Sequence, residues 1–121
     1  MWDAKMAKVV VIEDDDVVRG MLSFVLTDEG HQVRVFEDGA PFLDSNAVSW
    51  ADLIVTDLSM PTTGERVVRL VRQQGYDIPI IVVSGGISPE KAAYLFEQGV
   101  QEVIRKPLDF DEFVLCVEKW V

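Results

Sequence analysis

The stretch ADLIVTDLSMP, residues 51–61, decides how the chain folds. Residues 53–55 form a short apolar run bounded by polar residues, which is typical of a strand buried on both faces of a parallel sheet. The run leads to Asp57, and Pro61 ends any regular strand pairing soon after it. Open α/β sheets bind their ligands at the carboxyl ends of their strands. The stretch therefore places a carboxylate at such an end, although for the stretch taken alone an aspartate that only caps a turn is the better explanation.

The composition indicates one globular domain without a nucleic-acid or membrane partner. The chain has 121 residues, of which 49% are hydrophobic and 26% charged, and its formal net charge is −10. A surface this acidic repels a phosphate backbone, so we expect no direct binding to nucleic acid. No apolar run approaches the roughly 20 residues that span a bilayer. The single cysteine, Cys116, excludes an internal disulfide and fits a reducing, cytoplasmic location. We interpret residues 1–121 as one domain, with residues 1–7 as an N-terminal extension in which Met6 is an alternative start.

Strand-like and helix-like segments alternate along the rest of the chain. Further strands are predicted at residues 9–12, 33–36, 78–83 and 103–104. Helix starts are predicted after each strand, at Asp15 or Asp16, at Asp38, within residues 62–65, at Ser88 and at about Asp109. Five strands that alternate with five helices predict an α/β fold, with a doubly wound parallel sheet covered by helices on both faces.

Side-chain environments can be predicted for several positions outside the strands. Four residues at helical spacing are expected to face the core from the first helix: Val18, Met21, Leu22 and Val25. Val67, Val68 and Val71 are expected to face inward from the third helix, which turns three arginines to solvent: Arg66, Arg69 and Arg72. His31 follows Gly30 in a turn, and we expect it to be exposed.

Polar side chains follow four of the five predicted strands. In a parallel sheet the carboxyl ends meet at one edge, and this edge would receive Glu13, Asp14, Asp57, Ser84 and Lys106. Each of these residues alone is better explained as a helix cap, a loop residue or a surface charge. Their joint occurrence at the ends of four strands is much harder to explain in that way, and it predicts a functional site.

The chemistry of this set is consistent with phosphoryl transfer. Three carboxylates in one cleft repel one another, which either raises a pKa or requires a cation. Hard oxygen ligands with room for water suit Mg²⁺, which could hold an incoming phosphoryl oxygen. Lys106 would add a compact positive charge and Ser84 a hydroxyl donor. A carboxylate such as Asp57 can then act as the nucleophile and form an acyl phosphate.

The chain resembles the receiver domain of bacterial two-component response regulators. The segments that carry the resemblance are residues 9–15, 52–61, 79–85 and 106–107. It implies a flavodoxin-like fold with the strand order 2-1-3-4-5, and a cis bond between Lys106 and Pro107. It also implies roles for the residues at the sheet edge. Asp57 would be the phospho-acceptor; Asp14, Asp57 and the main-chain carbonyl of Ser59 would bind Mg²⁺, or Mn²⁺ in its place. Glu13 would act on the ion largely through water, Lys106 would contact the phosphoryl group, and Ser84 would be the switch hydroxyl.

The resemblance further implies a signalling switch rather than an enzyme with external substrates. The phosphoryl donor would be a sensor histidine kinase or a histidine phosphotransfer protein, and the chain would catalyse only its own phosphorylation and dephosphorylation. Phosphorylation would change the surface of the last two helices and the strand between them, which controls an output partner or domain. The cognate kinase and the output are left open, as are a homodimer and whether the chain is a piece of a longer regulator.

Two departures from the family pattern leave alternatives open. Val103 stands where the family usually has an aromatic switch residue, and the loop between Pro61 and Gly64 is one residue shorter than usual. Val103 slightly favours a pseudo-receiver, which binds partners without being phosphorylated. An aspartyl-phosphate hydrolase would generally carry a second aspartate where this chain has Ser59. Nucleotide or flavin binding is weaker still, because acids and no glycine-rich phosphate loop follow the first strand.

Overall fold

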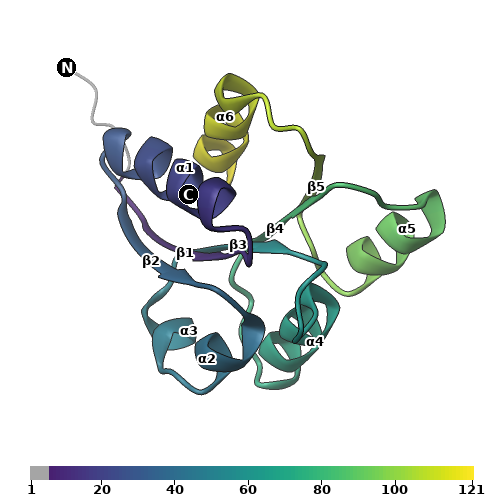
Figure 1. The fold of residues 1–121 in the computed structure, drawn as a ribbon. Coiled ribbons are helices and arrows are strands. Elements are labelled where there is room, and N and C mark those ends of the chain that lie inside the picture. Colours follow the sequence, from purple (N-terminus) through teal and green to yellow (C-terminus); the bar gives the residue numbers. More distant parts are fainter. Residues whose placement is uncertain (1–5) are drawn as a thin grey trace.

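A five-stranded parallel sheet in the order β2-β1-β3-β4-β5 forms the centre of the computed structural model, which describes residues 6–121 (Figure 1). The strands are β1 Lys8–Ile12, β2 Gln32–Phe36, β3 Leu53–Asp57, β4 Ile80–Ser84 and β5 Glu102–Arg105. This order confirms the predicted fold. Residues 1–5 of the expected N-terminal extension lie outside the described residues. Ala7, expected at the end of that extension, is buried.

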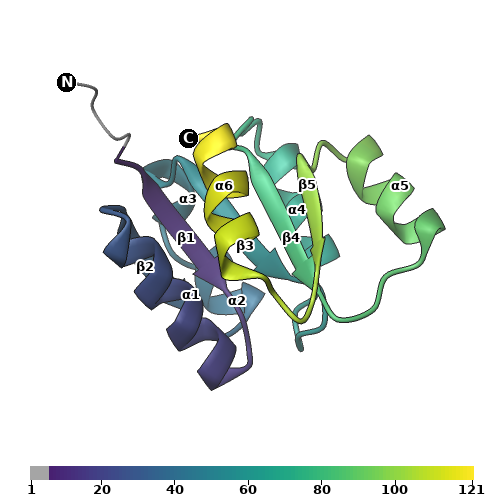
Figure 2. The same ribbon diagram turned by 90° about the horizontal axis from the view of Figure 1, so that it is seen from above.

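Helices cover both faces of the sheet (Figures 1 and 2). They are α1 Asp16–Asp28, α2 Gly39–Leu43, α3 Ala47–Trp50, α4 Gly64–Gln73, α5 Pro89–Glu97 and α6 Phe110–Trp120. Buried residues of α1 and α6 share one core with one face of the sheet, and the remaining helices pack in the core on the other face. Two short helices, α2 and α3, occupy the β2–β3 connection, where the sequence predicted one. Among the described residues, no helix is both long and apolar enough to span a membrane.

The central strands are apolar up to their polar carboxyl ends because their residues serve two cores. Along β3, Leu53 and Val55 pack on the side of α1 and α6, whereas Ile54 packs on the opposite side. Successive side chains of a strand point to opposite faces, so a strand covered on both faces needs an unbroken apolar sequence. The register pairs Asp57 with Val83 and Ser84 with Arg105, which brings the polar residues at the strand ends to the same edge.

The helices begin at the predicted caps. Asp15 Oδ1 accepts the N–H groups of Val17 and Val18 at 2.9 and 3.0 Å and so caps α1. The other side chains that cap long helices are Thr63, Ser88 and Asp109. These residues satisfy main-chain donors that a helix leaves unpaired at its first turn. The positions of the helices on the sheet are therefore set locally by the sequence.

Three side-chain environments differ from the prediction. Met21 is 46% exposed, and Leu26 is buried in its place; Met21 lies about 100° round the helix from Leu22, at the edge of the buried face. His31 is buried, and its Nδ1 accepts the N–H of Ala7 at 3.1 Å. Arg72 is half-buried and donates to the carbonyls of Tyr76 and Gly99, both at 2.8 Å. His31 and Arg72 each bind one main-chain group that is distant in sequence, at Ala7 and Gly99, which local patterns do not reveal.

Candidate functional site

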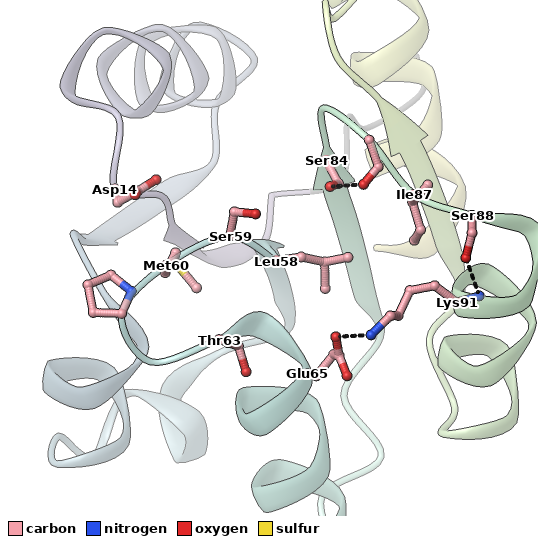
Figure 3. A pocket seen from close by; sticks show the side chains of 12 residues that line it. Asp14, Leu58, Ser59, Met60, Thr63, Glu65, Ser84, Ile87, Ser88 and Lys91 are labelled. Carbon is pink, nitrogen blue, oxygen red and sulfur yellow. Dashed lines mark hydrogen bonds and ion pairs between the residues drawn. The ribbon is translucent and has the colours of Figure 1, made fainter.

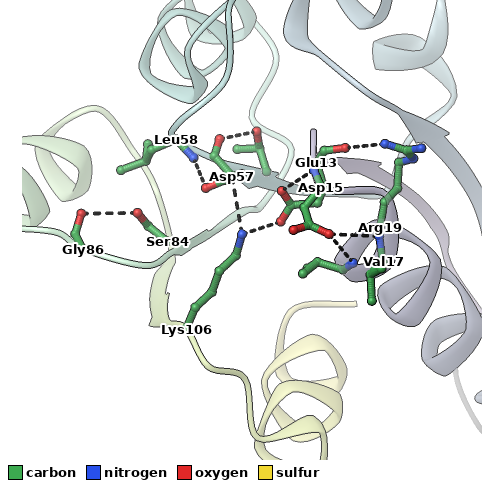
Figure 4. Close-up of polar contacts among 11 residues, drawn as sticks. Glu13, Asp15, Val17, Arg19, Asp57, Leu58, Ser84, Gly86 and Lys106 are labelled. Atoms are coloured by element: carbon green, nitrogen blue, oxygen red, sulfur yellow. Dashed lines mark hydrogen bonds and ion pairs between the residues drawn. The ribbon is translucent and has the colours of Figure 1, made fainter.

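The carboxyl edge of the sheet gathers the predicted polar residues; Figure 4 shows Glu13, Asp57, Ser84 and Lys106, and Figure 3 shows Asp14. Glu13 and Asp14 follow β1, Asp57 ends β3, Ser84 ends β4, and Lys106 follows β5. The sequence places each of them directly after an apolar strand, so the parallel pairing alone brings four segments of the chain together. Glu13, Asp57 and Ser84 are buried, whereas Asp14 is exposed.

Three of these residues form an acidic cluster that suits a divalent cation. One carboxylate oxygen each from Glu13, Asp14 and Asp57 lies within 4.8 Å of the other two. Glu13 is 1% and Asp57 6% exposed, so little water screens their repulsion. Oxygen ligands from a small number of carboxylates, with one side open to water, match the preferences of Mg²⁺. The residues present therefore fit the ion that receiver domains bind.

Lys106 is the cation that already faces this cluster. Its Nζ donates to Glu13 Oε1 at 2.6 Å and to Asp57 Oδ2 at 3.4 Å. Burial raises the pKa of the Glu13 carboxyl from 4.5 to about 7, although the hydrogen bond from Lys106 acts in the opposite direction. Burial alone would lower the pKa of Lys106, but the contacts with Glu13 and Asp57 raise it overall. One ammonium group thus serves two buried carboxylates.

The main chain around Asp57 fixes the carboxylate from the side of α4. Asp57 Oδ1 accepts the N–H of Leu58 at 2.7 Å. The N–H of Gly64 donates to the carbonyl of Leu58 at 3.0 Å. A Cβ added to Gly64 would overlap the carbonyl oxygen of Asp57, so only glycine permits this approach. Ser59 lies between these residues and is exposed.

Ser84 lies on the other flank of Asp57 but is turned toward its own loop. Its Oγ donates to the carbonyl of Gly86 at 3.4 Å. The next carbonyl, of Ile87, accepts Nη1 of Arg105 at 2.9 Å. The main chain of Ser84 is fixed by the N–H of Lys106, which donates to its carbonyl at 2.9 Å. The hydroxyl would therefore have to leave Gly86 to contact a group bound at Asp57.

An open pocket of about 610 Å³ lies beside Asp57, between the two flanking loops (Figure 3). It is lined by Asp14, Ser59, Thr63, Ser84 and Ser88, together with apolar residues of both loops. Glu65 of α4 and Lys91 of α5 also line it, and they form an ion pair at 2.5 Å. The pocket reaches the acidic cluster at Asp14 and runs past Leu58 and Ser59, the two residues that follow Asp57.

Sequence reasoning missed several residues that shape the site. Arg105 and the pair Glu65–Lys91 were not singled out, nor was Arg19, whose Nη1 donates to the Glu13 carbonyl at 3.0 Å. Each binds a group from another segment or a main-chain carbonyl, for which the sequence carries no spacing signal. Val103 is half-buried against the core shared by α4 and α5, and the Lys106–Pro107 bond is cis as expected.

Comparison with known proteins identifies the family. A profile of the response regulator receiver domain matches residues 9–118. The chain belongs to this family. As a receiver domain it is a component of two-component signal transduction, in which such domains act as phosphoryl-accepting switches.

Relatives of this receiver domain include proteins that are much longer. It is 30% identical over 110 residues to the DNA-binding transcriptional regulator NtrC of Escherichia coli K12, which covers 90% of this chain and 24% of NtrC. It is also 30% identical over 118 residues to the CAI-1 autoinducer sensor kinase/phosphatase CqsS of Vibrio cholerae, which covers 94% of this chain and 17% of CqsS. The chain thus spans a quarter or less of both proteins.

A solved structure of similar size shows the same fold. The chemotaxis protein CheY4 of Vibrio cholerae superimposes with a TM-score of 0.83 at 29% sequence identity, covering 97% of this chain and 100% of CheY4. The receiver domain described here therefore matches the whole of that protein as well as segments of longer ones.

Proposed function

We propose that this receiver domain accepts a phosphoryl group on Asp57, in a Mg²⁺-dependent reaction, from a sensor histidine kinase or a histidine phosphotransfer protein. The observation that carries the proposal is the convergence of Glu13, Asp14 and Asp57 within 4.8 Å, with Lys106 donating to two of them. Among the described residues this is the group of acidic side chains whose spacing suits a metal ion.

Each residue has a distinct role in this proposal. Asp14, Asp57 and the main-chain carbonyl of Ser59 hold Mg²⁺, with Mn²⁺ as a substitute, and Glu13 acts largely through water. When bound, the ion would supply positive charge beside these carboxylates and a Lewis-acid partner for a phosphoryl oxygen. A carboxylate oxygen of Asp57 attacks phosphorus, and the bond from phosphorus to the donor's nitrogen breaks as the acyl phosphate forms. Lys106, already beside Asp57 Oδ2, stabilises the negative charge of the transferred group.

Ser84 would convert phosphorylation into a change of surface. Its hydroxyl leaves the Gly86 carbonyl and donates to a phosphoryl oxygen, which draws residues 84–88 toward Asp57. This segment leads into α5, so the shift biases the surface of α5, β5 and α6 between two arrangements. That surface would control a partner or an output domain, as expected for residues 1–121 acting as one receiver domain.

A pseudo-receiver is the second candidate, and Val103 is the observation that favours it. A half-buried valine has no hydroxyl or ring that could follow Ser84 inward. In this alternative the domain would dock partners without being phosphorylated. The complete set of Glu13, Asp14, Asp57 and Lys106 favours the switch, because a docking module does not need a buried, repelling carboxylate cluster.

Intact mass measurement after incubation with Mg²⁺ and acetyl phosphate separates these functions. The switch predicts one phosphoryl adduct on the wild-type protein and none on Asp57→Asn. Asp52→Asn is the matched control, since Asp52 lies at the opposite end of β3 and its Oδ2 accepts the N–H of Lys8 at 2.9 Å. No adduct and no rise in melting temperature with Mg²⁺ would indicate the pseudo-receiver. Steady phosphate release from external phosphate esters would indicate a hydrolase instead.

A further inference from the structure

We propose that Arg105 is a positioning residue for the Ser84 hydroxyl. Its guanidinium holds the segment 84–88 in the arrangement in which that hydroxyl is engaged with Gly86 rather than with a group on Asp57. The inference rests on the proposed function, in which Asp57 carries the phosphoryl group and Ser84 responds to it. In this proposal Arg105, the last residue of β5, controls how readily the Ser84 hydroxyl leaves the Gly86 carbonyl.

The contacts of two successive carbonyls link Arg105 to Ser84 (Figure 4 shows the contact of Ser84 with Gly86). The Gly86 carbonyl accepts the Ser84 hydroxyl at 3.4 Å, a long distance for a bond between oxygens, which indicates a weak hydrogen bond. The Ile87 carbonyl accepts Arg105 Nη1 at 2.9 Å, and this bond has a charged donor. The peptide that Ser84 must release is therefore adjacent to the one that Arg105 holds.

The anchor on β5 is rigid relative to Ser84. Ser84 and Arg105 are register partners in the β4–β5 ladder, and the N–H of Lys106 donates to the Ser84 carbonyl at 2.9 Å. The main chain at both ends of the contact is thus fixed by the sheet. Any movement toward Asp57 is therefore confined to residues 85–88. The bond from Arg105 Nη1 to the Ile87 carbonyl lies within this segment.

The segment between the two anchors is otherwise easy to move. Gly85 and Gly86 are exposed, and a Cβ added to either would meet nothing within 4 Å. Ile87 is held by packing of its side chain, which is 9% exposed, and by the bond from Arg105 to its carbonyl. The ion pair Glu65–Lys91 joins α4 to α5 beyond this segment and does not contact its carbonyls. Among the described residues, Arg105 is thus the side chain from another strand that hydrogen-bonds to the main chain of this segment.

Releasing this restraint should favour the arrangement in which Ser84 reaches the phosphoryl group. Because Arg105 is exposed, its bond stabilises the arrangement with Ser84 bonded to Gly86 by a free energy at the lower end of the range for charged donors. We therefore expect Arg105→Ala to speed adduct formation about three-fold. Loss of a positive charge would by itself slow the reaction with an anionic donor. The expected change in the rate of adduct formation, an increase, is therefore opposite to the decrease that loss of charge alone would cause.

The test measures initial rates of adduct formation on the whole chain with Mg²⁺ and acetyl phosphate, by intact mass. Arg105→Ala should react about three-fold faster than wild type, and Arg105→Lys, which keeps the charge and a donor, should lie between them. Arg69→Ala is the matched control, because Arg69 is an exposed arginine on α4, and it should react at the wild-type rate. In the Ser84→Ala background the effect of Arg105→Ala should vanish, since the two residues act through one hydroxyl.

Amide hydrogen exchange in the unphosphorylated protein provides a second readout. Residues 85–88 should exchange faster in Arg105→Ala than in wild type or in Arg69→Ala, while the β4 and β5 amides keep their protection. Arg105→Gln serves in place of Arg105→Ala if the alanine variant loses cooperative melting.

Three outcomes distinguish a failure of the proposed function from a failure of the role of Arg105. No adduct on wild type overturns the proposed function itself. Equal rates for wild type and Arg105→Ala, with both proteins phosphorylated, overturn the role of Arg105 and leave the proposed function intact. An acceleration that persists in the Ser84→Ala background also overturns that role, because Arg105 would then act without Ser84.

Discussion

Polar side chains at the two edges of the sheet are paired in different ways. At the amino edge, three buried or half-buried polar side chains are matched to main-chain groups: His31 accepts from Ala7, Gln101 Oε1 accepts the N–H of Ile80 at 2.7 Å, and Arg72 donates to two carbonyls. At the carboxyl edge, the buried carboxylates of Glu13 and Asp57 share a single ammonium group, that of Lys106.

This difference separates stability from function within one fold. Hydrogen bonds at the amino edge offset the burial of polar atoms, and the residues named there gather no like charges around one point. The carboxyl edge retains more negative charge than its own cation can neutralise, which disfavours the folded chain but attracts a divalent ion and a phosphoryl group. Substitutions at the two edges should therefore affect different measurements.

The largest effect should follow from removing the cation of the carboxyl edge. Lys106→Met should slow adduct formation with acetyl phosphate by about 100-fold, because no ammonium group then stabilises the transferred charge. Initial rates by intact mass measure this. Lys119→Met makes the same chemical change on an exposed lysine of α6 and should leave the rate unchanged. Equal rates for Lys106→Met and wild type would exclude a role for the ammonium group in the reaction.

The buried carboxylate of Glu13 should make stability depend on pH. Its pKa is about 7 in the folded chain against an ordinary value of 4.5, so the folded state binds the proton more tightly than the unfolded state. The free energy of unfolding therefore falls as pH rises from 4.5 to 7. In Glu13→Gln this decline should be smaller, by on the order of 2 kcal/mol. Urea unfolding in the presence of a chelator measures it, and parallel profiles for the two proteins would contradict the assignment.

At the amino edge, the corresponding substitution should reduce stability and leave the reaction intact. Arg72→Met leaves the carbonyls of Tyr76 and Gly99 without their donor and should lower the free energy of unfolding by about 1–2 kcal/mol. Its rate of adduct formation should equal that of wild type. Arg69→Met, on the exposed face of the same helix, should change neither quantity. A slower reaction in Arg72→Met would show that the two edges are coupled.

The smallest effect expected is stabilisation by the ion alone. Mg²⁺ at ten times its dissociation constant should stabilise the folded chain by about 1.4 kcal/mol, because it binds the acidic cluster only when the chain is folded. The rise in melting temperature should be lost in Asp14→Asn and retained in Asp52→Asn, which changes an aspartate at the amino edge. Stabilisation that survives in Asp14→Asn would place the ion elsewhere.

Features encoded by neighbouring residues could be predicted from the sequence. The β-branched runs and the caps at Asp15, Thr63, Ser88 and Asp109 fixed the strands and most helix starts, because strand burial and helix capping depend on adjacent positions. The gathering of Glu13, Asp14, Asp57 and Lys106 followed from the same pattern, since parallel strands necessarily end at one edge.

The features that escaped prediction depend on partners distant in sequence. His31 is buried because the N–H of Ala7, 24 residues earlier, needs an acceptor, and Arg72 is half-buried because the Gly99 carbonyl needs a donor. The bond of Arg105 to the Ile87 carbonyl depends on the course of a loop, which residue types do not specify. For a polar residue on an outward face, the neighbouring sequence does not show whether the side chain is exposed to solvent or bonded to a distant main-chain group.

The close approach of Gly64 to the carbonyl of Asp57 has a consequence for redesign. A larger residue at 64 would push α4 away from the proposed acceptor, so this flank does not tolerate added bulk. On the opposite flank, open space surrounds the Cβ positions of Gly85 and Gly86. Side chains can therefore be accommodated at 85 and 86. In the proposed function they would retune the lifetime of the phosphorylated state while the helix beside the acceptor stays unchanged.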